Sequence, residues 1–120
     1  MEQRSIGSLR VSVVGLGCNQ LGTSACDEAT GVQIVKEAVE AGINYFDTSD
    51  EYGRDYFNDT DPSGWGRSEE ILGKALASCR DDVLIATKFG PPGPSVDGQP
   101  MFPWERSQSG RRGITIAVEE

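Results

Sequence analysis

The chain has 120 residues, of which 11 are Lys or Arg and 19 are Asp or Glu, so its net charge is −8. This length suffices for one hydrophobic core, and the acidic balance argues against nucleic acid or an anionic membrane as a partner. The sequence has no apolar run of ~20 residues, as a membrane span needs, and no apolar leader. Its three cysteines suit reduced structural thiols rather than a disulfide framework or a zinc site. We therefore expect a cytoplasmic protein.

The N-terminal half predicts a hairpin, a strand and a helix, followed by a second strand. Residues 2–13 form two alternating runs around Gly7, as in a β-hairpin. Residues 13–17 are a candidate first strand and residues 43–47 a second. Between them, Asp27 can cap a helix that Gly42 ends. The apolar face expected for this helix consists of Ala29, Val32, Val35, Ala38 and Val39.

A second helix and a third strand follow. Ser68 is expected to cap the helix, with Glu69 and Glu70 in its first turn, where the helix dipole favours anions. Its apolar face would be Ile71, Leu72, Ala75, Leu76 and Cys79, and residues 83–88 would form the strand. Apolar strands that alternate with amphipathic helices are typical of an α/β fold with parallel strands.

Two long segments interrupt this alternation, and both follow a strand. Residues 54–67 and 89–110 are predicted to be extended loops, whose aromatic side chains suit either a substrate pocket or ordinary surface. Residues 114–120 resemble the opening of a helix that has no stop signal. We therefore expect residues 1–120 to be the N-terminal part of a single longer domain.

Three chemically active side chains fall at or just after predicted strand ends. Asp47 ends the second strand, Tyr52 follows in the next loop, and Lys88 ends the third strand. Because parallel strands finish at one edge of a sheet, we expect a carboxylate, a phenol and an ammonium to meet there. A cation beside a phenol favours the phenolate, so Tyr52 is a candidate proton donor.

The runs around these residues resemble the aldo-keto reductases. Residues 42–49 read Gly-Ile-Asn-Tyr-Phe-Asp-Thr-Ser, and Tyr52-Gly53 precedes Ser-Glu-Glu-Ile-Leu-Gly-Lys-Ala-Leu at residues 68–76, with Thr87-Lys88 after them. The resemblance covers about residues 9–89 and implies a TIM (β/α)8 barrel. This chain would supply the N-terminal hairpin and the first three β/α units, because a complete barrel needs roughly 250 residues.

The resemblance also implies an activity, the reduction of an aldehyde or ketone with NADPH, with NADH as the alternative cofactor. Tyr52 would protonate the carbonyl oxygen, Lys88 would assist it, and Asp47 would bind Lys88 and approach the nicotinamide ribose. Gly17, Cys18 and Asn19 fall where the family's first strand meets the cofactor. The small-molecule carbonyl would be the partner, and no metal is implied.

The chain departs from the family pattern in two ways. The family's fourth catalytic residue is a histidine, which this chain lacks, so we expect it beyond Glu120 together with the phosphate-binding loops. The loop at 54–67 is also longer than usual, which leaves the substrate class open. The alternatives are a non-catalytic fragment or a regulatory binding protein on the same fold, and we expect residues 1–120 alone to be inactive.

A glycine-rich stretch at residues 15–22 invites comparison with a Rossmann phosphate loop. That fingerprint requires a third glycine three residues after the second, and Gln20 occupies this position. We reject this interpretation.

A minor alternative is a calcium-binding loop at residues 59–70. Oxygen-bearing side chains fall at EF-hand positions 1, 3, 5 and 12, with Gly64 at position 6. Pro62 and Arg67 argue against this motif, and Glu70 is already explained by the second helix.

Overall fold

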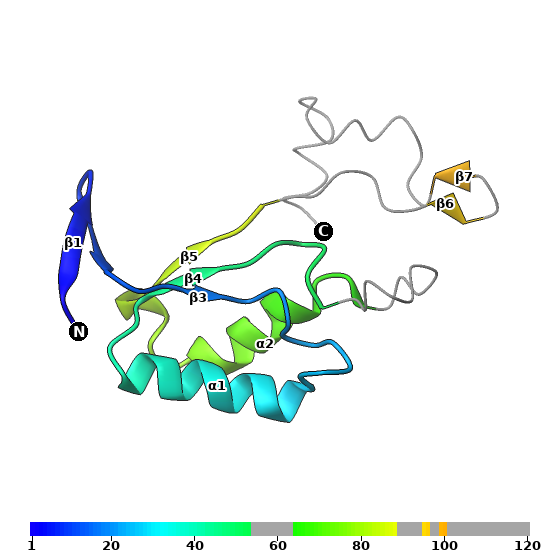
Figure 1. Cartoon of the computed structure of the whole chain (residues 1–120), viewed down its shortest axis with the longest axis horizontal. Coiled ribbons are helices and arrows are strands. Elements are labelled where there is room, and N and C mark those ends of the chain that lie inside the picture. The colour runs from blue at the N-terminus through cyan, green and yellow to red at the C-terminus, as the bar shows by residue number, and fades with distance from the viewer. Residues whose placement is uncertain (54–63, 89–94, 97–98, 101–120) are drawn as a thin grey trace.

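The computed structural model describes residues 1–53, 64–88, 95–96 and 99–100. Strands β3 (Leu16–Gly17), β4 (Tyr45–Asp47) and β5 (Leu84–Ala86) form a parallel sheet in the order β3-β4-β5. Helices α1 (Glu28–Glu40) and α2 (Arg67–Leu76) cover one face of this sheet (Figure 1). The predicted alternation of parallel strands and helices is confirmed, and the described strands form an open sheet rather than a closed barrel.

The N-terminal hairpin is also confirmed. Strands β1 (Gln3–Ile6) and β2 (Leu9–Ser12) pair antiparallel, and Ile6 faces Leu9 across a two-residue turn. The first residue of this turn, Gly7, has a φ of +59°, which glycine adopts without strain. Asn44 joins the hairpin to the start of β4, because its Oδ1 accepts from the Ser12 amide at 2.8 Å. The hairpin therefore lies at the end of the sheet where the strands begin (Figure 1).

The three parallel strands are shorter than predicted. The run 13–17 contributes only the two residues of β3, because the amide of Val13 bonds to Glu2 at 3.0 Å and so continues the hairpin. Val13 and Val14 are accordingly exposed. In the other two strands the ladder begins at Tyr45 and Leu84, and Thr87 and Lys88 lie beyond its end.

Helix α1 has the predicted ends. The Asp27 side chain accepts from the Thr30 amide at 2.9 Å, and Gly42 follows the helix with a φ of +89°. The predicted apolar face needs one correction, because Ala29 is exposed and Gly31 is buried. Gly31, Val35 and Ala38 form the buried stripe, and Ala29 lies roughly half a turn away from it at 100° per residue.

Helix α2 requires a second correction. The residue before the helix is Gly66, which has a φ of +75°, and no side chain caps the helix. Backbone carbonyls of the preceding loop bind the first amides instead: Gly66 donates to Asp50 at 2.7 Å and Ser68 to Tyr52 at 3.2 Å. Ser68 is thus inside the first turn and is not the cap, which leaves its hydroxyl free for other partners.

The core lies between the sheet and the two helices. Its most buried large side chains come from β4, α1 and α2 and are at most 1% exposed: Phe46, Val35, Ile71, Leu72 and Leu76. Cys79 lies beyond the end of α2 and packs against this core, followed by the short 3₁₀ helix η2 (Arg80–Asp82). The apolar face predicted for α2 is therefore confirmed for Ile71, Leu72, Ala75 and Leu76, whereas Cys79 lies outside the helix.

Several predicted features fall largely outside the described residues. Residues 54–63, most of 89–110 and the helix expected at 114–120 are among them. Within 89–110 the structure describes two short antiparallel strands, β6 (Ser95–Val96) and β7 (Gln99–Pro100), where we expected a loop without strands. Among the described helices, none has the length and apolar character needed to cross a membrane.

Candidate functional site

The alternation of side chains along β4 places Asp47 on the face of the sheet opposite the helices. Phe46 is fully buried on the helix side, whereas its neighbour Asp47 is half-buried. Asp47 is opposite Ala86 in the β4–β5 register. Since side chains alternate along a strand, Lys88, two residues after Ala86, lies on the same face as Asp47.

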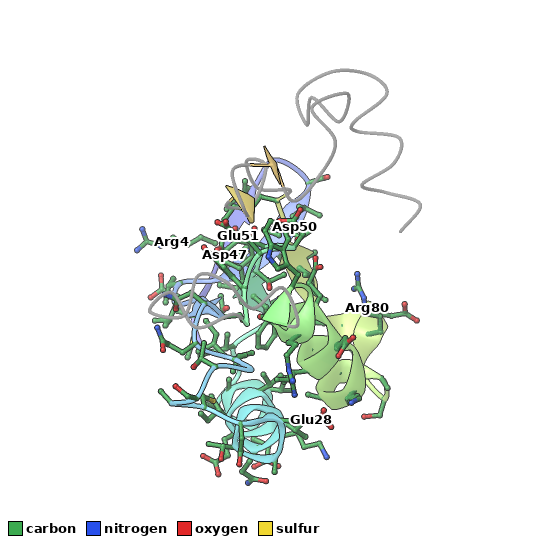
Figure 2. The ribbon with its side chains drawn as sticks, turned by 90° about the vertical axis from the view of Figure 1, so that its right-hand side faces the viewer. Arg4, Glu28, Asp47, Asp50, Glu51 and Arg80 are labelled. Atoms are coloured by element: carbon green, nitrogen blue, oxygen red, sulfur yellow. The ribbon has the colours of Figure 1, made fainter. Side chains whose placement is uncertain are left out.

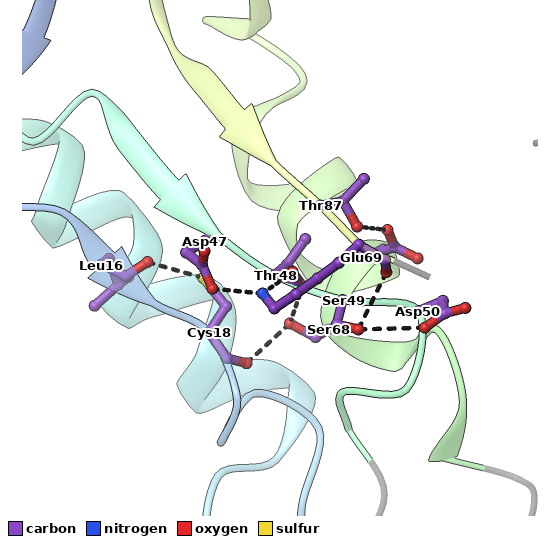
Figure 3. Close-up of polar contacts among 10 residues, drawn as sticks. Leu16, Cys18, Asp47, Thr48, Ser49, Asp50, Ser68, Glu69 and Thr87 are labelled. Atoms are coloured by element: carbon purple, nitrogen blue, oxygen red, sulfur yellow. Dashed lines mark hydrogen bonds and ion pairs between the residues drawn. The ribbon is translucent and has the colours of Figure 1, made fainter. Parts of the chain in front are cut away.

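Lys88 and Asp47 form a direct ion pair at the ends of these strands. The Lys88 ammonium nitrogen lies 2.7 Å from Asp47 Oδ1, and it also donates to the Thr48 carbonyl at 2.6 Å (Figure 3). Burial by itself would lower the pKa of Lys88. Hydrogen bonds and charge interactions with Asp47 and Tyr52 outweigh that effect and raise this pKa above its ordinary value of 10.5. The ammonium is therefore retained at neutral pH.

Tyr52 completes the group. The Lys88 nitrogen lies 4.8 Å from the centre of the Tyr52 ring, within the range of a cation–π contact. The amide of Tyr52 donates to Ser49 at 3.1 Å, which makes a tight turn after β4. The structure thus brings the three predicted catalytic side chains together around one ammonium.

Two glycines let the loops after β3 and β4 pass close to the start of α2. A Cβ atom on Gly53, whose φ is +112°, would lie 2.6 Å from Arg67 Cβ and 2.8 Å from the Gly64 carbonyl oxygen. One on Gly22, whose φ is +88°, would lie 2.8 Å from the same Arg67 atom. Neither position accepts a side chain without a shift, so the close approach of these two loops to the start of α2 depends on glycine.

The residues predicted to meet a cofactor lie beside this group but face different ways. Gly17 is paired with Asp47 in the sheet, and a Cβ atom placed on it would meet nothing within 4 Å. Asn19 is exposed. The Cys18 side chain is fully buried in the core, and burial first, with the Asp47 charge adding to it, raises the pKa of this thiol to about 12. The backbone of Cys18 is also taken up, because its amide donates to the Asp47 carbonyl at 2.9 Å and its carbonyl accepts from Ser68. Of these three residues, only Gly17 and Asn19 are exposed.

Sequence reasoning missed four polar residues beneath the site. The Ser68 and Thr48 hydroxyls lie 2.9 Å apart, both side chains are fully buried, and Ser68 also donates to the Cys18 carbonyl at 2.9 Å. The Thr87 hydroxyl donates to Glu69 at 2.6 Å (Figure 3). A serine before a helical run is typical of an N-cap, so nothing in the sequence indicated that Ser68 contacts Thr48 and Cys18.

The end of the sheet is acidic. Viewed from this end, Asp47, Asp50 and Glu51 lie near the start of α2, away from Glu28 on α1 (Figure 2). In the part of the chain that the structure describes, no group of three or more Cys, Asp or Glu side chains is placed to hold a metal ion. Residues 59–63 of the calcium-loop hypothesis lie outside that part.

Comparisons with known proteins agree on one protein family. The sequence model of the aldo/keto reductase family matches residues 13–114. The chain is 39% identical over 111 residues to the uncharacterized oxidoreductase YqkF of Bacillus subtilis, covering 91% of this chain and 31% of that protein. It is 38% identical over 97 residues to L-galactose dehydrogenase of Arabidopsis thaliana, covering 75% of this chain and 27% of that protein.

A solved structure agrees with these sequence matches. The aldo-keto reductase AKR11C1 from Bacillus halodurans, in its holo form, superimposes with a TM-score of 0.68 at 36% identity. The match covers 99% of this chain and 34% of that one. The chain therefore spans about a third of the length of the proteins that it resembles.

Proposed function

Because this chain belongs to the aldo/keto reductase family, we propose that it supplies the proton-donor half of a site that reduces an aldehyde or ketone. The observation that carries the proposal is the position of the Lys88 ammonium, 2.7 Å from Asp47 Oδ1 and 4.8 Å from the centre of the Tyr52 ring. Tyr52 donates its phenolic proton to the carbonyl oxygen of the substrate. The protein then acts as an oxidoreductase whose substrate is a small carbonyl compound.

Lys88 assists Tyr52 electrostatically. As the proton leaves the phenol, negative charge develops on its oxygen, and a nearby ammonium stabilises that charge. The Asp47 carboxylate and the Thr48 carbonyl both accept hydrogen bonds from the ammonium. Lys88 is protonated throughout the neutral range, because its pKa lies above 10.5, so its charge is present whenever Tyr52 donates.

The residues present suit one edge of a nicotinamide site. The space beside Gly17 is open, and the half-buried Asp47 carboxylate next to it can accept hydrogen bonds from hydroxyl groups such as those of a ribose. Asn19, two residues after Gly17, is exposed as well. When bound, NADPH, or NADH as the alternative, supplies the hydride. The chain's own residues hold the cofactor edge and deliver the proton.

We also place the protein in the cytoplasm. The cysteines within the described residues, Cys18, Cys26 and Cys79, are free thiols. Free thiols suit a reducing compartment, where disulfides are rare.

The test is a carbonyl-dependent NADPH oxidation assay on the full-length protein that carries this sequence. Because L-galactose dehydrogenase is a relative, the substrate panel starts with sugars, and L-galactose is assayed in the oxidative direction. We expect Tyr52→Phe to lower kcat by about 10²- to 10⁴-fold, the usual contribution of general acid catalysis.

The matched control is Tyr45→Phe, which removes a phenolic oxygen from β4 outside the Asp47–Lys88–Tyr52 group, and it should leave kcat near the wild-type value. If Tyr52→Phe retains full kcat, Tyr52 is not the proton donor. If the full-length protein binds NADPH but turns over no carbonyl in the panel, the result favours the regulatory alternative.

A further inference from the structure

Two adjacent residues of α2, Ser68 and Glu69, contact all three strands of the parallel sheet at the ends where the site begins. The Ser68 hydroxyl donates to the Cys18 carbonyl just after β3 and meets the Thr48 hydroxyl just after β4. The Glu69 carboxylate accepts from Thr87 just after β5 at 2.6 Å. One turn of helix therefore joins three segments that are far apart in the sequence.

Each partner is the sequence neighbour of a residue in the proposed site. Cys18 follows Gly17, Thr48 follows Asp47, and Thr87 precedes Lys88. The backbone of Ser68 adds a fourth contact, because its amide donates to the Tyr52 carbonyl at 3.2 Å. The first turn of α2 thus contacts Tyr52 directly and the other site residues through their immediate neighbours.

The ion pair between Lys88 and Asp47 does not fix its own geometry. Both side chains are nearly half exposed, at 48% and 46%, and ion pairs of this exposure are weak and readily broken by water. The distance between the two groups must therefore be set by the backbone that carries them. At these positions the backbone is restrained by the contacts from α2.

The Thr48–Ser68 contact is also costly to bury unless its hydrogen bonds are made. Both residues are 0% exposed, and an unpaired buried hydroxyl would be strongly unfavourable. The two hydroxyls satisfy each other, and the Cys18 carbonyl takes the remaining bond. An apolar pair of similar size would fill the same space without linking β3, β4 and α2.

We propose that Ser68 and Glu69 are positioning residues, which hold the ends of β3, β4 and β5 in the arrangement that keeps Lys88 between Asp47 and Tyr52. This inference rests on the proposed function. It assigns to the first turn of α2 the role of setting the site's geometry, while Tyr52, Asp47 and Lys88 carry the chemistry.

The experiment uses variants of the full-length protein that remove single contacts. Ser68→Ala and Thr48→Val delete one buried hydroxyl each, and Thr48→Val keeps the side-chain shape. Thr48→Ser retains the hydroxyl and is the conservative rescue. Glu69→Ala removes the β5 contact on the exposed side of the helix, where a folding defect is least expected. Val35→Ala, in the core on α1, is the control for general loss of stability.

The first readout is the titration of the Lys88 ammonium, followed by ¹³C NMR with lysine labelled at Cε and assigned by its loss in Lys88→Met. The titratable groups that act on this ammonium are Asp47 and Tyr52, and the buried Cys18 thiol interacts with its charge. We expect Ser68→Ala and Thr48→Val to lower the Lys88 pKa toward 10.5, because the ammonium then loses its fixed contact with Asp47. Thr48→Ser and Val35→Ala should leave it unchanged.

The second readout is steady-state kinetics. We expect Ser68→Ala, Thr48→Val and Glu69→Ala to lower kcat by about 10- to 100-fold, the size of effect that a displacement near 1 Å produces. The KM for the carbonyl should stay within about threefold, because the contacts act on the proton donor rather than on ground-state binding. Val35→Ala should lower Tm without this loss of kcat.

The outcomes separate the two proposals. If the Lys88 titration and kcat of Ser68→Ala and Thr48→Val match those of Val35→Ala at similar Tm, the positioning role is overturned and the proposed function stands. If the wild-type protein reduces no carbonyl but Ser68→Ala still lowers the Lys88 pKa relative to wild type, the positioning role is supported and the proposed function fails.

Discussion

The Lys88 ammonium binds the Asp47 carboxylate and the Thr48 carbonyl at the same time, at 2.7 and 2.6 Å. Asp47 and Thr48 lie 41 and 40 positions before Lys88 in the sequence. The contact joins the ends of two neighbouring parallel strands, β4 and β5. Because both charged side chains are nearly half exposed, the contact contributes more to the orientation of the ammonium than to the stability of the fold.

Stability should depend on Lys88 in a defined alkaline window. The pKa of Lys88 is raised in the folded state, so its stabilisation is complete below the unfolded value of 10.5 and is lost as the pH rises through the higher folded value. We expect Lys88→Met to reduce the free energy of unfolding by at most about 1 kcal/mol at pH about 9. This difference should shrink toward zero at pH about 12.

Urea unfolding of both proteins at the two pH values measures this effect. Asp47→Asn, which keeps the shape of the side chain and removes its charge, provides the control, because Lys88→Met made on that background should change the unfolding free energy much less. A difference that grows with pH would show that Asp47 and Tyr52 do not raise the Lys88 pKa.

Two glycines on either side of the start of α2 should respond oppositely to alanine. Gly53→Ala places a Cβ atom 2.6 Å from Arg67 Cβ at a φ of +112°, and we expect it to cost more than about 1 kcal/mol of stability. Gly73→Ala, exposed within α2 with nothing within 4 Å, should instead add about 0.4–1 kcal/mol. Thermal unfolding compares the two, and equal Tm values for both variants would refute the close packing at Gly53.

Among the three cysteines, Cys79 should react first with a disulfide reagent. The Cys18 thiol is fully buried and has a pKa of about 12, so at pH 8 only about one molecule in ten thousand carries its thiolate. Burial also raises the pKa of Cys26, and the neighbouring Asp27 adds to that effect. Cys79 is only half-buried.

The measurement is the time course of thiol release with Ellman's reagent at pH about 8. It is followed on the wild-type protein and on Cys79→Ser, before and after unfolding in urea. We expect Cys79→Ser to lose the fast phase and to keep the slow ones. If the fast phase survives in Cys79→Ser, the burial of Cys18 or Cys26 seen in the structure is wrong.

Local patterns were sufficient for the elements and for the identity of the candidate site. The apolar runs and their order predicted three parallel strands and two covering helices, and the cap at Asp27 and the stop at Gly42 were visible as local chemistry. The run from Gly42 to Ser49 and the block at residues 68–76 carried the family resemblance. These features depend on neighbours within a few residues, which is the range over which a sequence pattern is read directly.

Tertiary structure decided the role of Ser68, the orientation of Cys18 and the distances around Lys88. From the sequence, Ser68 was expected to cap α2, but carbonyls of Asp50 and Tyr52 satisfy the first amides of that helix. Its hydroxyl therefore turns to Thr48 and Cys18 instead. A hydrogen bond between residues 20 or 50 positions apart depends on how strands and helix pack, and side-chain type at either position does not specify it.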